Sequence, residues 1–189
     1  MSLEESRFTP ARDWCMHPEY WHSPDSEATE MEVTGFLGAL VTMIQPEYVV
    51  ETGTYHGHTA AAIGAALYVN GHGRLVSIEN NGEHYEEALH TLDGWNYPVK
   101  LVHGNTMDFV PEQNIDFAFF DSWQEGRIEE YTRFYSLGFL KPGAIVAFHD
   151  TAPHHQVRKT ILPLEGIGEG ELRIIDFRTP RGLILGQVR

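Results

Sequence analysis

Cysteine is nearly absent from this chain of 189 residues, in which Cys15 is the only one. A single cysteine excludes an intramolecular disulfide and a zinc site made of cysteines. Such usage is typical of proteins in a reducing compartment, so we expect the chain to lie in the cytoplasm. Long apolar runs and signal-peptide patterns are lacking too, which predicts no association with a membrane.

Positive charge is also scarce. The sequence has 13 lysine and arginine residues against 27 aspartate and glutamate residues, which gives a formal net charge of -14. This balance repels a phosphate backbone and no basic run offsets it, so nucleic acid is not expected as a partner. The length fits one domain with a substantial core.

A glycine-rich turn lies between two regular segments. Residues 48–50 are apolar and β-branched, which predicts a buried strand, and the alanine-rich segment from Ala60 predicts a helix. Gly53 and Gly57 let the backbone between them turn sharply and approach a ligand, and the free N–H groups of the helix point into the turn. The pattern is typical of half of a nucleotide-binding unit, although an ordinary strand-to-helix loop has the same local features.

Strand and helix patterns alternate along the rest of the chain. Strands are expected at 48–50, 74–78, 99–102, 115–120, 144–148, 172–177 and 182–186, and helices at 26–45, 60–69, 83–92, 127–140 and 155–162, with a glycine-rich loop at 165–170. We expect Asp25 or Ser26 to cap the first helix, and Lys141-Pro142-Gly143 to end the fourth. The alternation predicts an α/β fold, a Rossmann-like, doubly wound, mostly parallel seven-stranded sheet that closes with a C-terminal antiparallel hairpin.

The amino-terminal residues follow a different pattern. Trp14, Tyr20 and Trp21 lie in a segment broken by prolines, which suits neither a plain tail nor a helix. We interpret residues 1–25 as an arm. It is either an aromatic lid over a small molecule or a segment packed against the flank of the domain.

Polar residues follow the ends of the predicted strands. Glu79, after the second strand, is placed to accept hydrogen bonds from the two hydroxyls of a ribose, although a surface glutamate has the same local pattern. Asn105 follows the third strand, where an amide could flank an adenine edge. Asp121 follows the fourth strand and His149-Asp150 the fifth, so these side chains are expected at one edge of the sheet.

Together these motifs resemble class I S-adenosylmethionine-dependent methyltransferases, over about residues 26–189. The resemblance rests on Glu51-x-Gly53-x-x-x-Gly57, on Glu79, on the strand that ends at Asp121, on the segment LKPGAIVAFHD that ends in His149-Asp150, and on the closing hairpin. Within that superfamily the chain is similar to small-molecule O-methyltransferases, both the catechol type and the type that modifies macrolide sugars. The resemblance implies an enzyme that methylates a hydroxyl of a small molecule. A homodimer of the chain is a further expectation.

The resemblance also implies where S-adenosylmethionine binds. The methionine end would lie at the glycine turn, the ribose at Glu79 and the adenine at Asn105. The residues expected to contact the cofactor are Glu51, Gly53, Thr54, Gly57, Glu79, Asn80, Asn105 and Asp121.

Asp121, His149 and Asp150 are the expected catalytic residues, with two routes open. Asp121 and Asp150 would hold Mg²⁺, which orients the acceptor and lowers the pKa of its hydroxyl. In the other route His149 is a general base and no metal is needed. Gln124 departs from the catechol family, because a catalytic lysine stands at that position there.

Two other functions share parts of this pattern. A nicotinamide-dependent oxidoreductase also has an acidic residue after its second strand, but the turn lacks Gly-x-Gly-x-x-Gly and the terminal hairpin does not belong to that fold. A cofactor-binding module without catalysis would keep the same pocket, with Gln124 as a sign of lost chemistry.

Overall fold

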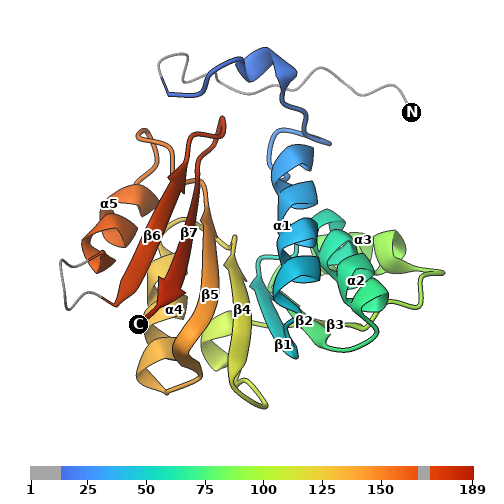
Figure 1. The fold of residues 1–189 in the computed structure, drawn as a ribbon. Helices are drawn as coiled ribbons and strands as arrows, with labels where there is room; N and C mark the ends of the chain where they lie inside the picture. The colour runs from blue at the N-terminus through green and yellow to red at the C-terminus, as the bar shows by residue number, and fades with distance from the viewer. Residues whose placement is uncertain (1–13, 166–170) are drawn as a thin grey trace.

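Seven strands within residues 14–165 and 171–189, the part of the chain that the computed structural model describes, form one sheet in the order β3-β2-β1-β4-β5-β7-β6 (Figure 1). They are β1 (Tyr48–Thr52), β2 (Arg74–Glu79), β3 (Val99–His103), β4 (Ile115–Phe120), β5 (Leu140–His149), β6 (Leu172–Phe177) and β7 (Leu183–Val188). Neighbours among the first five strands pair in parallel, whereas β7 runs antiparallel to both β5 and β6. The predicted sheet and its C-terminal hairpin are confirmed.

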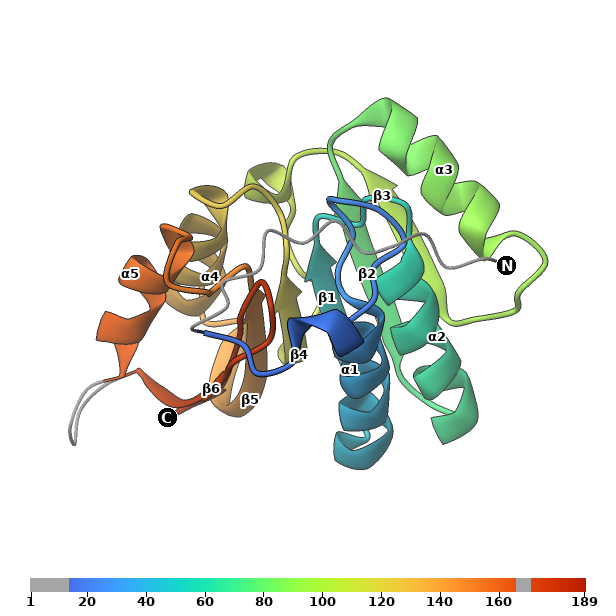
Figure 2. The same ribbon diagram turned by 90° about the horizontal axis from the view of Figure 1, so that it is seen from above.

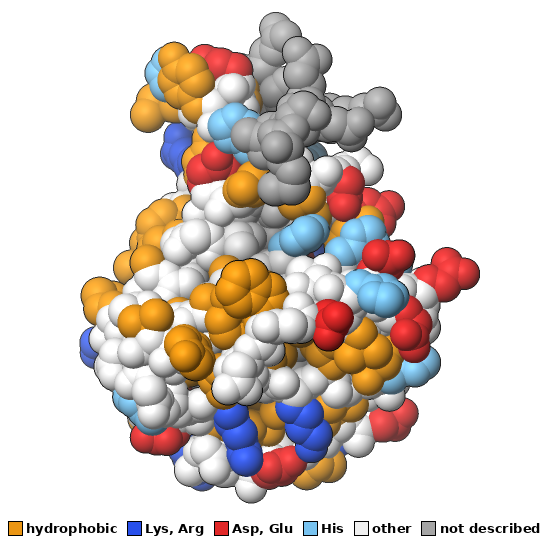
Figure 3. Space-filling model, turned by 90° about the vertical axis from the view of Figure 1, so that its right-hand side faces the viewer, with side chains coloured by type: hydrophobic (Ala, Val, Ile, Leu, Met, Phe, Trp, Pro, Cys, Tyr) orange, Lys and Arg blue, Asp and Glu red, His pale blue; other side chains and the backbone are white. Residues whose placement is uncertain are grey.

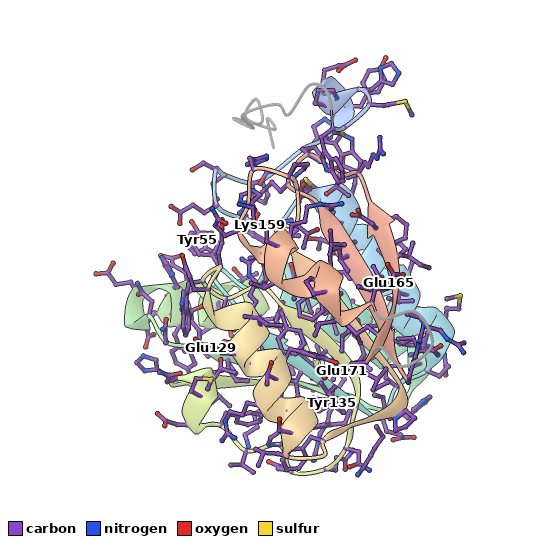
Figure 4. All side chains as sticks on the ribbon, turned by 90° about the vertical axis from the view of Figure 1, so that its left-hand side faces the viewer. Tyr55, Glu129, Tyr135, Lys159, Glu165 and Glu171 are labelled. Carbon is purple, nitrogen blue, oxygen red and sulfur yellow. The ribbon has the colours of Figure 1, made fainter. Side chains whose placement is uncertain are left out.

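Helices cover both faces of this sheet. They are α1 (Met31–Ile44), α2 (His58–Asn70), α3 (Gly82–Leu92), α4 (Gly126–Ser136) and α5 (Val157–Ile161). α1 and α2 pack together on one face, and α4 contacts α5 on the other (Figure 2). Figure 4 shows this second face, with Glu129 and Tyr135 labelled on α4 and Lys159 on α5. The doubly wound Rossmann-like arrangement is therefore confirmed.

The side chains of β4 show why the sheet is buried on both sides. Phe117 and Phe119 lie in the apolar cluster under α1 and α2, whereas Ala118 and Phe120 lie in the cluster under α4 and α5. All four are fully buried. A continuous apolar run is what a strand needs when successive side chains enter two different cores.

The predicted cap of the first helix is wrong. α1 begins at Met31 with Glu30 as its N-cap, and not after Asp25 or Ser26. Asp25 instead accepts hydrogen bonds from the N–H groups of residues 27 and 28, which form a bend before the helix. Aspartate favours such local bonds in turns as well as at helix caps, so the sequence pattern does not separate the two.

The predicted end of the fourth helix is also wrong. α4 ends at Ser136, Gly138 turns the chain with a φ of 77°, and β5 begins at Leu140. Leu140 pairs with Ile115 and is 3% exposed, so the sheet buries this leucine. An irregular register after Ile115 accommodates Pro142, since proline lacks the N–H that a regular ladder requires.

Trp14 anchors the described part of the amino-terminal arm. The guanidinium groups of Arg158 and Arg178 lie 4.6 Å and 5.1 Å from the centroid of its ring, within the range of cation–π attraction. Farther along, His22 Nδ1 lies 2.8 Å from Glu32 Oε1 on α1. The described part of the arm thus contacts α1, α5 and the loop after β6.

Parts of two predicted segments lie outside the described residues. These are residues 1–13 of the arm and residues 166–170 of the glycine-rich loop. The division of the chain at residue 25 and the function of the arm as a lid stay predictions. Across the described ranges, no helix is both long enough and apolar enough to cross a membrane.

The order of the strands places the functional site. Chain connections proceed outward from β1 toward β2 and β3 on one side, and from β4 toward β5 on the other. Ligands of open α/β sheets bind at such a switch point, beyond the carboxyl ends of the strands. Gly53 follows β1 and Asp121 follows β4, so these residues flank the position where a ligand is expected.

Candidate functional site

A cavity of about 400 Å³ lies at this switch point, a size suited to a small ligand. Five of the eight residues predicted to contact the cofactor line it: Gly53, Thr54, Glu79, Asn80 and Asp121. The first residues after the arm, Glu27, Ala28 and Thr29, form part of its wall. The site therefore combines the glycine turn with a segment that the sequence does not mark as part of a pocket.

Gly53 lets the loops after β1 and β4 meet. Its φ is 80°, and a Cβ at this position would lie 2.5 Å from the carbonyl oxygen of Asp121. Its N–H donates to the carbonyl of Ile78, and the N–H of Asp121 donates to the carbonyl of Thr52, each at 2.9 Å. Only glycine fits this combination of conformation and close backbone approach.

Glu79 is fixed in place at the wall of the cavity. Its Oε2 accepts a hydrogen bond from the N–H of Tyr55 at 2.8 Å, and its Oε1 accepts one from the N–H of Asn81 at 2.9 Å. A carboxylate has about four acceptor positions, so both oxygens keep capacity for the hydroxyls of a ribose. The residues at this end of the cavity therefore fit the nucleoside part of S-adenosylmethionine.

The other three residues predicted to contact the cofactor do not line the cavity. Glu51 is 1% exposed and accepts a hydrogen bond from Ser77 Oγ at 2.6 Å, and burial raises its pKa to about 8. Gly57 starts α2 and approaches Ala88 so closely that a Cβ would lie 3.2 Å from it. Asn105 Oδ1 accepts from the backbone N–H of residue 107. Their contact with a cofactor stays a prediction.

The structure brings the three predicted catalytic residues together. A carboxylate oxygen of Asp121, one of Asp150 and a ring nitrogen of His149 all lie within 4.8 Å of one another. Only Asp121, whose side chain is 12% exposed, and Asp150 line the cavity. His149 is fully buried behind them.

Both ring nitrogens of His149 face carboxylates. Nδ1 lies 3.1 Å from Asp121 Oδ1, and Nε2 lies 2.5 Å from Glu30 Oε2 at the start of α1. Burial alone would lower the pKa of His149, but the charges of Asp121, Glu30 and Asp150 outweigh it and raise the pKa to about 10. The ring is therefore charged at neutral pH, and an imidazolium has no lone pair with which to accept a proton.

Two arginines complete this group of charges. Arg127 Nη2 lies 3.0 Å from Asp121 Oδ1 and 2.9 Å from Asp150 Oδ2, and Arg181 Nε lies 2.6 Å from Asp150 Oδ1. Burial would raise the pKa of Asp150, but His149 and the two arginines hold that pKa well below its ordinary value. We call the six residues Glu30, Asp121, Arg127, His149, Asp150 and Arg181 the charge cluster.

The charge cluster does not fit a divalent cation. Its three carboxylates are balanced by three cationic groups, and each oxygen of Asp121 and Asp150 has a donor within 3.1 Å, which includes Thr29 Oγ1 on Asp121 Oδ2. A metal needs deprotonated ligands, whereas His149 is protonated here. The atoms have the spacing of a metal site but the charges of an ion-pair network.

Gln124, at the position of the catechol-family lysine, has a partner of its own. Its Nε2 lies 2.7 Å from Nδ1 of His155, a residue just before α5. Burial lowers the pKa of His155 to about 4, so this ring is neutral. Gln124 lines the cavity, so the wall at this position is polar and uncharged.

Histidines also gather at the mouth of the cavity. His56, His58 and His84 line it, and the ring of His56 stacks on Tyr55 with 3.7 Å between the centroids. Figure 3, which views the molecule from the right-hand side of Figure 1, shows histidine side chains close to acidic ones on this face.

The sequence pattern misses three members of the charge cluster, which are Glu30, Arg127 and Arg181. Glu30 accepts a hydrogen bond from the backbone N–H of Arg181, which is 151 residues away along the chain. Locally, Glu30 is only an acidic residue at a helix start, and Arg181 is part of a hairpin turn. A contact between residues so far apart along the chain leaves no signal in a single sequence.

Comparison with known proteins gives consistent results. The model of a methyltransferase domain family matches residues 50–151, just over half of the chain. Catechol O-methyltransferase B of Danio rerio is 26% identical over 119 residues, which are 58% of this chain and 44% of that protein. Caffeoyl-CoA O-methyltransferase 2 of Zea mays is 25% identical over 160 residues, 79% of this chain and 56% of that protein. The chain thus spans about half the length of these relatives.

Solved structures share the fold. The SAH-bound methyltransferase from Podospora anserina has a TM-score of 0.74 and 14% identity, and the match covers 86% of this chain and 80% of that one. An O-methyltransferase from Streptomyces achromogenes in complex with SAM has a TM-score of 0.69 and 22% identity, with coverage of 86% and 82%.

Proposed function

This chain belongs to the methyltransferase domain family, and we propose that it transfers a methyl group from S-adenosylmethionine to a hydroxyl of a small molecule. The observation that carries the proposal is the cavity at the switch point, where Gly53, Glu79 and Asp121 meet. The relatives named O-methyltransferases and the neighbours named with bound SAM or SAH support the same cofactor and reaction.

In this proposal the glycine turn and Glu79 hold the cofactor. The carboxylate of Glu79, fixed by the backbone N–H groups of Tyr55 and Asn81, accepts hydrogen bonds from the ribose. The backbone at Gly53 approaches the cofactor without a Cβ between them. S-adenosylmethionine supplies an electrophilic methyl group on its sulfonium.

The acceptor end of the cavity lies at Asp121 and Asp150. Methyl transfer is an in-line displacement, so the main task of the protein is to hold the acceptor oxygen opposite the leaving sulfur. Asp121 is the carboxylate that meets the acceptor, because its side chain reaches the cavity while His149 lies behind it. It takes the proton that the hydroxyl loses as the bond from oxygen to methyl forms and the bond from sulfur to methyl breaks. We assign His149 the task of positioning Asp121 through the 3.1 Å contact at Nδ1.

The class of acceptor follows from the lining and from the relatives. Trp123, which is 46% exposed, Tyr55 and histidine rings line the cavity and suit a flat aromatic molecule. The two relatives are named for catechol and for caffeoyl-CoA, which supports a hydroxylated aromatic acceptor. A hydroxylated sugar is the second class, given the resemblance to the macrolide-sugar enzymes.

Calorimetry with S-adenosylmethionine, S-adenosylhomocysteine and NAD tests the choice of cofactor. We expect saturable binding of the first two and none of NAD. A screen of catechols, flavonoids and hydroxylated sugars, read by the S-adenosylhomocysteine formed, then tests catalysis. Binding of NAD alone would favour an oxidoreductase, and binding of S-adenosylmethionine without turnover on any acceptor would favour a silent module.

A further inference from the structure

We propose that Arg127 and Arg181 take the place of a divalent cation at the acceptor end of the site, so that this chain works without a metal. The inference rests on the proposed function as far as turnover is concerned. The claim that no divalent cation binds here rests only on the contacts within the charge cluster. Asp121 and Asp150 are the predicted metal ligands, and the two guanidinium groups lie against their carboxylates.

Both carboxylate oxygens of Asp150 are bonded to guanidinium groups. Its Oδ1 accepts from Arg181 Nε at 2.6 Å, and its Oδ2 accepts from Arg127 Nη2 at 2.9 Å and from Arg181 Nη2 at 3.1 Å. Arg181 therefore grips the carboxylate with two parallel bonds, the geometry in which a guanidinium binds a carboxylate most specifically. A cation at this carboxylate would lie against two guanidinium charges, which repel it.

Arg127 is 3% exposed, and each of the three nitrogens of its guanidinium group has a hydrogen-bond partner. Besides the two carboxylates, its Nε donates to the carbonyl of Ser122 at 2.8 Å and its Nη1 donates to the carbonyl of His149 at 2.5 Å. A dication would leave this buried guanidinium without its counter-charges. Uncompensated buried charge is strongly destabilising.

Arg181 also donates hydrogen bonds to backbone carbonyl groups. Its Nη1 donates to the carbonyl of Glu27 at 2.7 Å and to the carbonyl of Ala28 at 3.0 Å, in the segment that precedes α1. Its backbone N–H donates to Glu30. The turn between β6 and β7 thus places a guanidinium where the segment before α1, the end of β5 and the cavity meet.

This position gives Arg181 a chemical task. Its side chain is 19% exposed and the residue lines the cavity, so its positive charge faces the acceptor end. A metal at this end would orient the acceptor and favour its ionised oxygen. A fixed guanidinium favours negative charge on the same oxygen by electrostatic stabilisation. The arginines therefore act on the acceptor oxygen as positioning and charge-stabilising groups.

Titration of the intact chain with Mn²⁺, followed by the paramagnetic resonance signal of the free ion, tests the inference without any methyl transfer. We expect no saturable binding, and the same melting temperature with added Mg²⁺ and with EDTA. Stoichiometric Mn²⁺ binding by the wild-type chain would overturn the inference. These readouts decide the question even where no acceptor is known.

The substitution Arg181→Gln gives the complementary test. It removes two bonds and one positive charge from Asp150, so we expect saturable Mn²⁺ binding in the variant, at least about tenfold tighter than any residual binding by the wild type. Arg173→Gln, an exposed arginine on β6, is the matched control and should leave Mn²⁺ binding unchanged. A folded Arg181→Gln variant that binds Mn²⁺ no better than the control contradicts the inference. Should the variant not fold, the wild-type titration decides.

Turnover with an identified acceptor adds a third readout. We expect the rate to stay within about twofold after thorough chelation with EDTA, a change of less than 0.5 kcal/mol in the barrier. A loss of more than about tenfold that Mg²⁺ restores would overturn the inference. Failure to bind S-adenosylmethionine would instead contradict the proposed function and leave the Mn²⁺ results as they stand.

Discussion

Glu30 Oε2 lies 2.5 Å from His149 Nε2, and both side chains are fully buried although 119 residues separate them along the chain. This contact joins the start of α1 to the carboxyl end of β5. It also holds the imidazolium whose other nitrogen faces Asp121. The segment before α1 is therefore part of the site, and α1 is more than a cover for the sheet.

Glu30→Gln tests the weight of this contact. The variant leaves a buried imidazolium with one counter-charge fewer, and we expect the free energy of unfolding to fall by about 3 to 5 kcal/mol. Glu32→Gln is the control, because Glu32 pairs with His22 at 2.8 Å in a half-exposed position and should cost less than about 1 kcal/mol. Urea unfolding measures both. Equal losses of free energy in the two variants would mean that the buried pair stabilises the fold no more than the half-exposed pair does.

Gly53→Ala tests the close approach of the two loops. Gly53 and Gly71 both have positive φ values, 80° and 75°, but only at Gly53 would a Cβ meet backbone, 2.5 Å from Asp121 O. We expect Gly71→Ala to cost on the order of 1 kcal/mol from backbone strain, and Gly53→Ala to cost more and to weaken the binding of S-adenosylmethionine. Thermal unfolding and calorimetry measure these effects. An alanine at residue 53 with wild-type affinity would place the cofactor elsewhere.

Glu79→Ala tests the ribose contact. Loss of charge-assisted hydrogen bonds should weaken the binding of S-adenosylmethionine by on the order of 2 kcal/mol. Glu83→Ala, an exposed glutamate in the first turn of α3, is the matched control and should bind as the wild type does. Because Glu79 also accepts two backbone N–H groups, the melting temperature of each free variant is measured beside its affinity. Unchanged affinity in a folded Glu79→Ala variant would refute the assignment.

Glu51→Gln tests a pH dependence of stability. Burial raises the pKa of Glu51 from its ordinary value of 4.5 to about 8, so the folded chain keeps a proton that the unfolded chain releases within this window. The free energy of unfolding of the wild type should therefore fall as pH rises, by up to about 1.4 kcal/mol per pH unit from this group.

A glutamine at residue 51 does not titrate, so it removes this decrease of the free energy of unfolding with rising pH. Without cofactor, we expect the variant to gain stability relative to the wild type as pH rises from about 5 to about 8.5. Glu47→Gln, an exposed residue beside β1, should show no such gain. Since the other groups cancel in the comparison, a difference that does not change with pH would mean that Glu51 is ionised in the folded chain.

The sequence predicts the fold well because the fold is encoded locally. Apolar runs such as residues 115–120 and the turn at residues 179–182 mark strands and hairpin through side-chain periodicity and turn chemistry. The boundaries at Asp25 and Leu140 are wrong, since the same residues suit a turn or a cap, a helix or a strand, until tertiary contacts decide. The cytoplasmic location and the homodimer stay predictions.

The site divides in the same way. Gly53, Glu79 and Asp121 follow strand ends, so topology alone brings them to one cavity. Two further partners, Glu30 of His149 and Arg181 of Asp150, come from the segment before α1 and from the terminal hairpin, and no spacing in the sequence connects those regions. The local sequence suggests His149 as a general base. In the folded chain, neighbouring carboxylates keep its ring protonated.

Transfer of a labelled methyl group tests the central claim most directly. The intact chain is incubated with S-adenosylmethionine labelled on its methyl group and with a panel of catechols, flavonoids and hydroxylated sugars. The account predicts label on a hydroxyl oxygen of at least one acceptor, with an equal amount of S-adenosylhomocysteine. Label that stays on S-adenosylmethionine across the whole panel, with the cofactor bound, would contradict it.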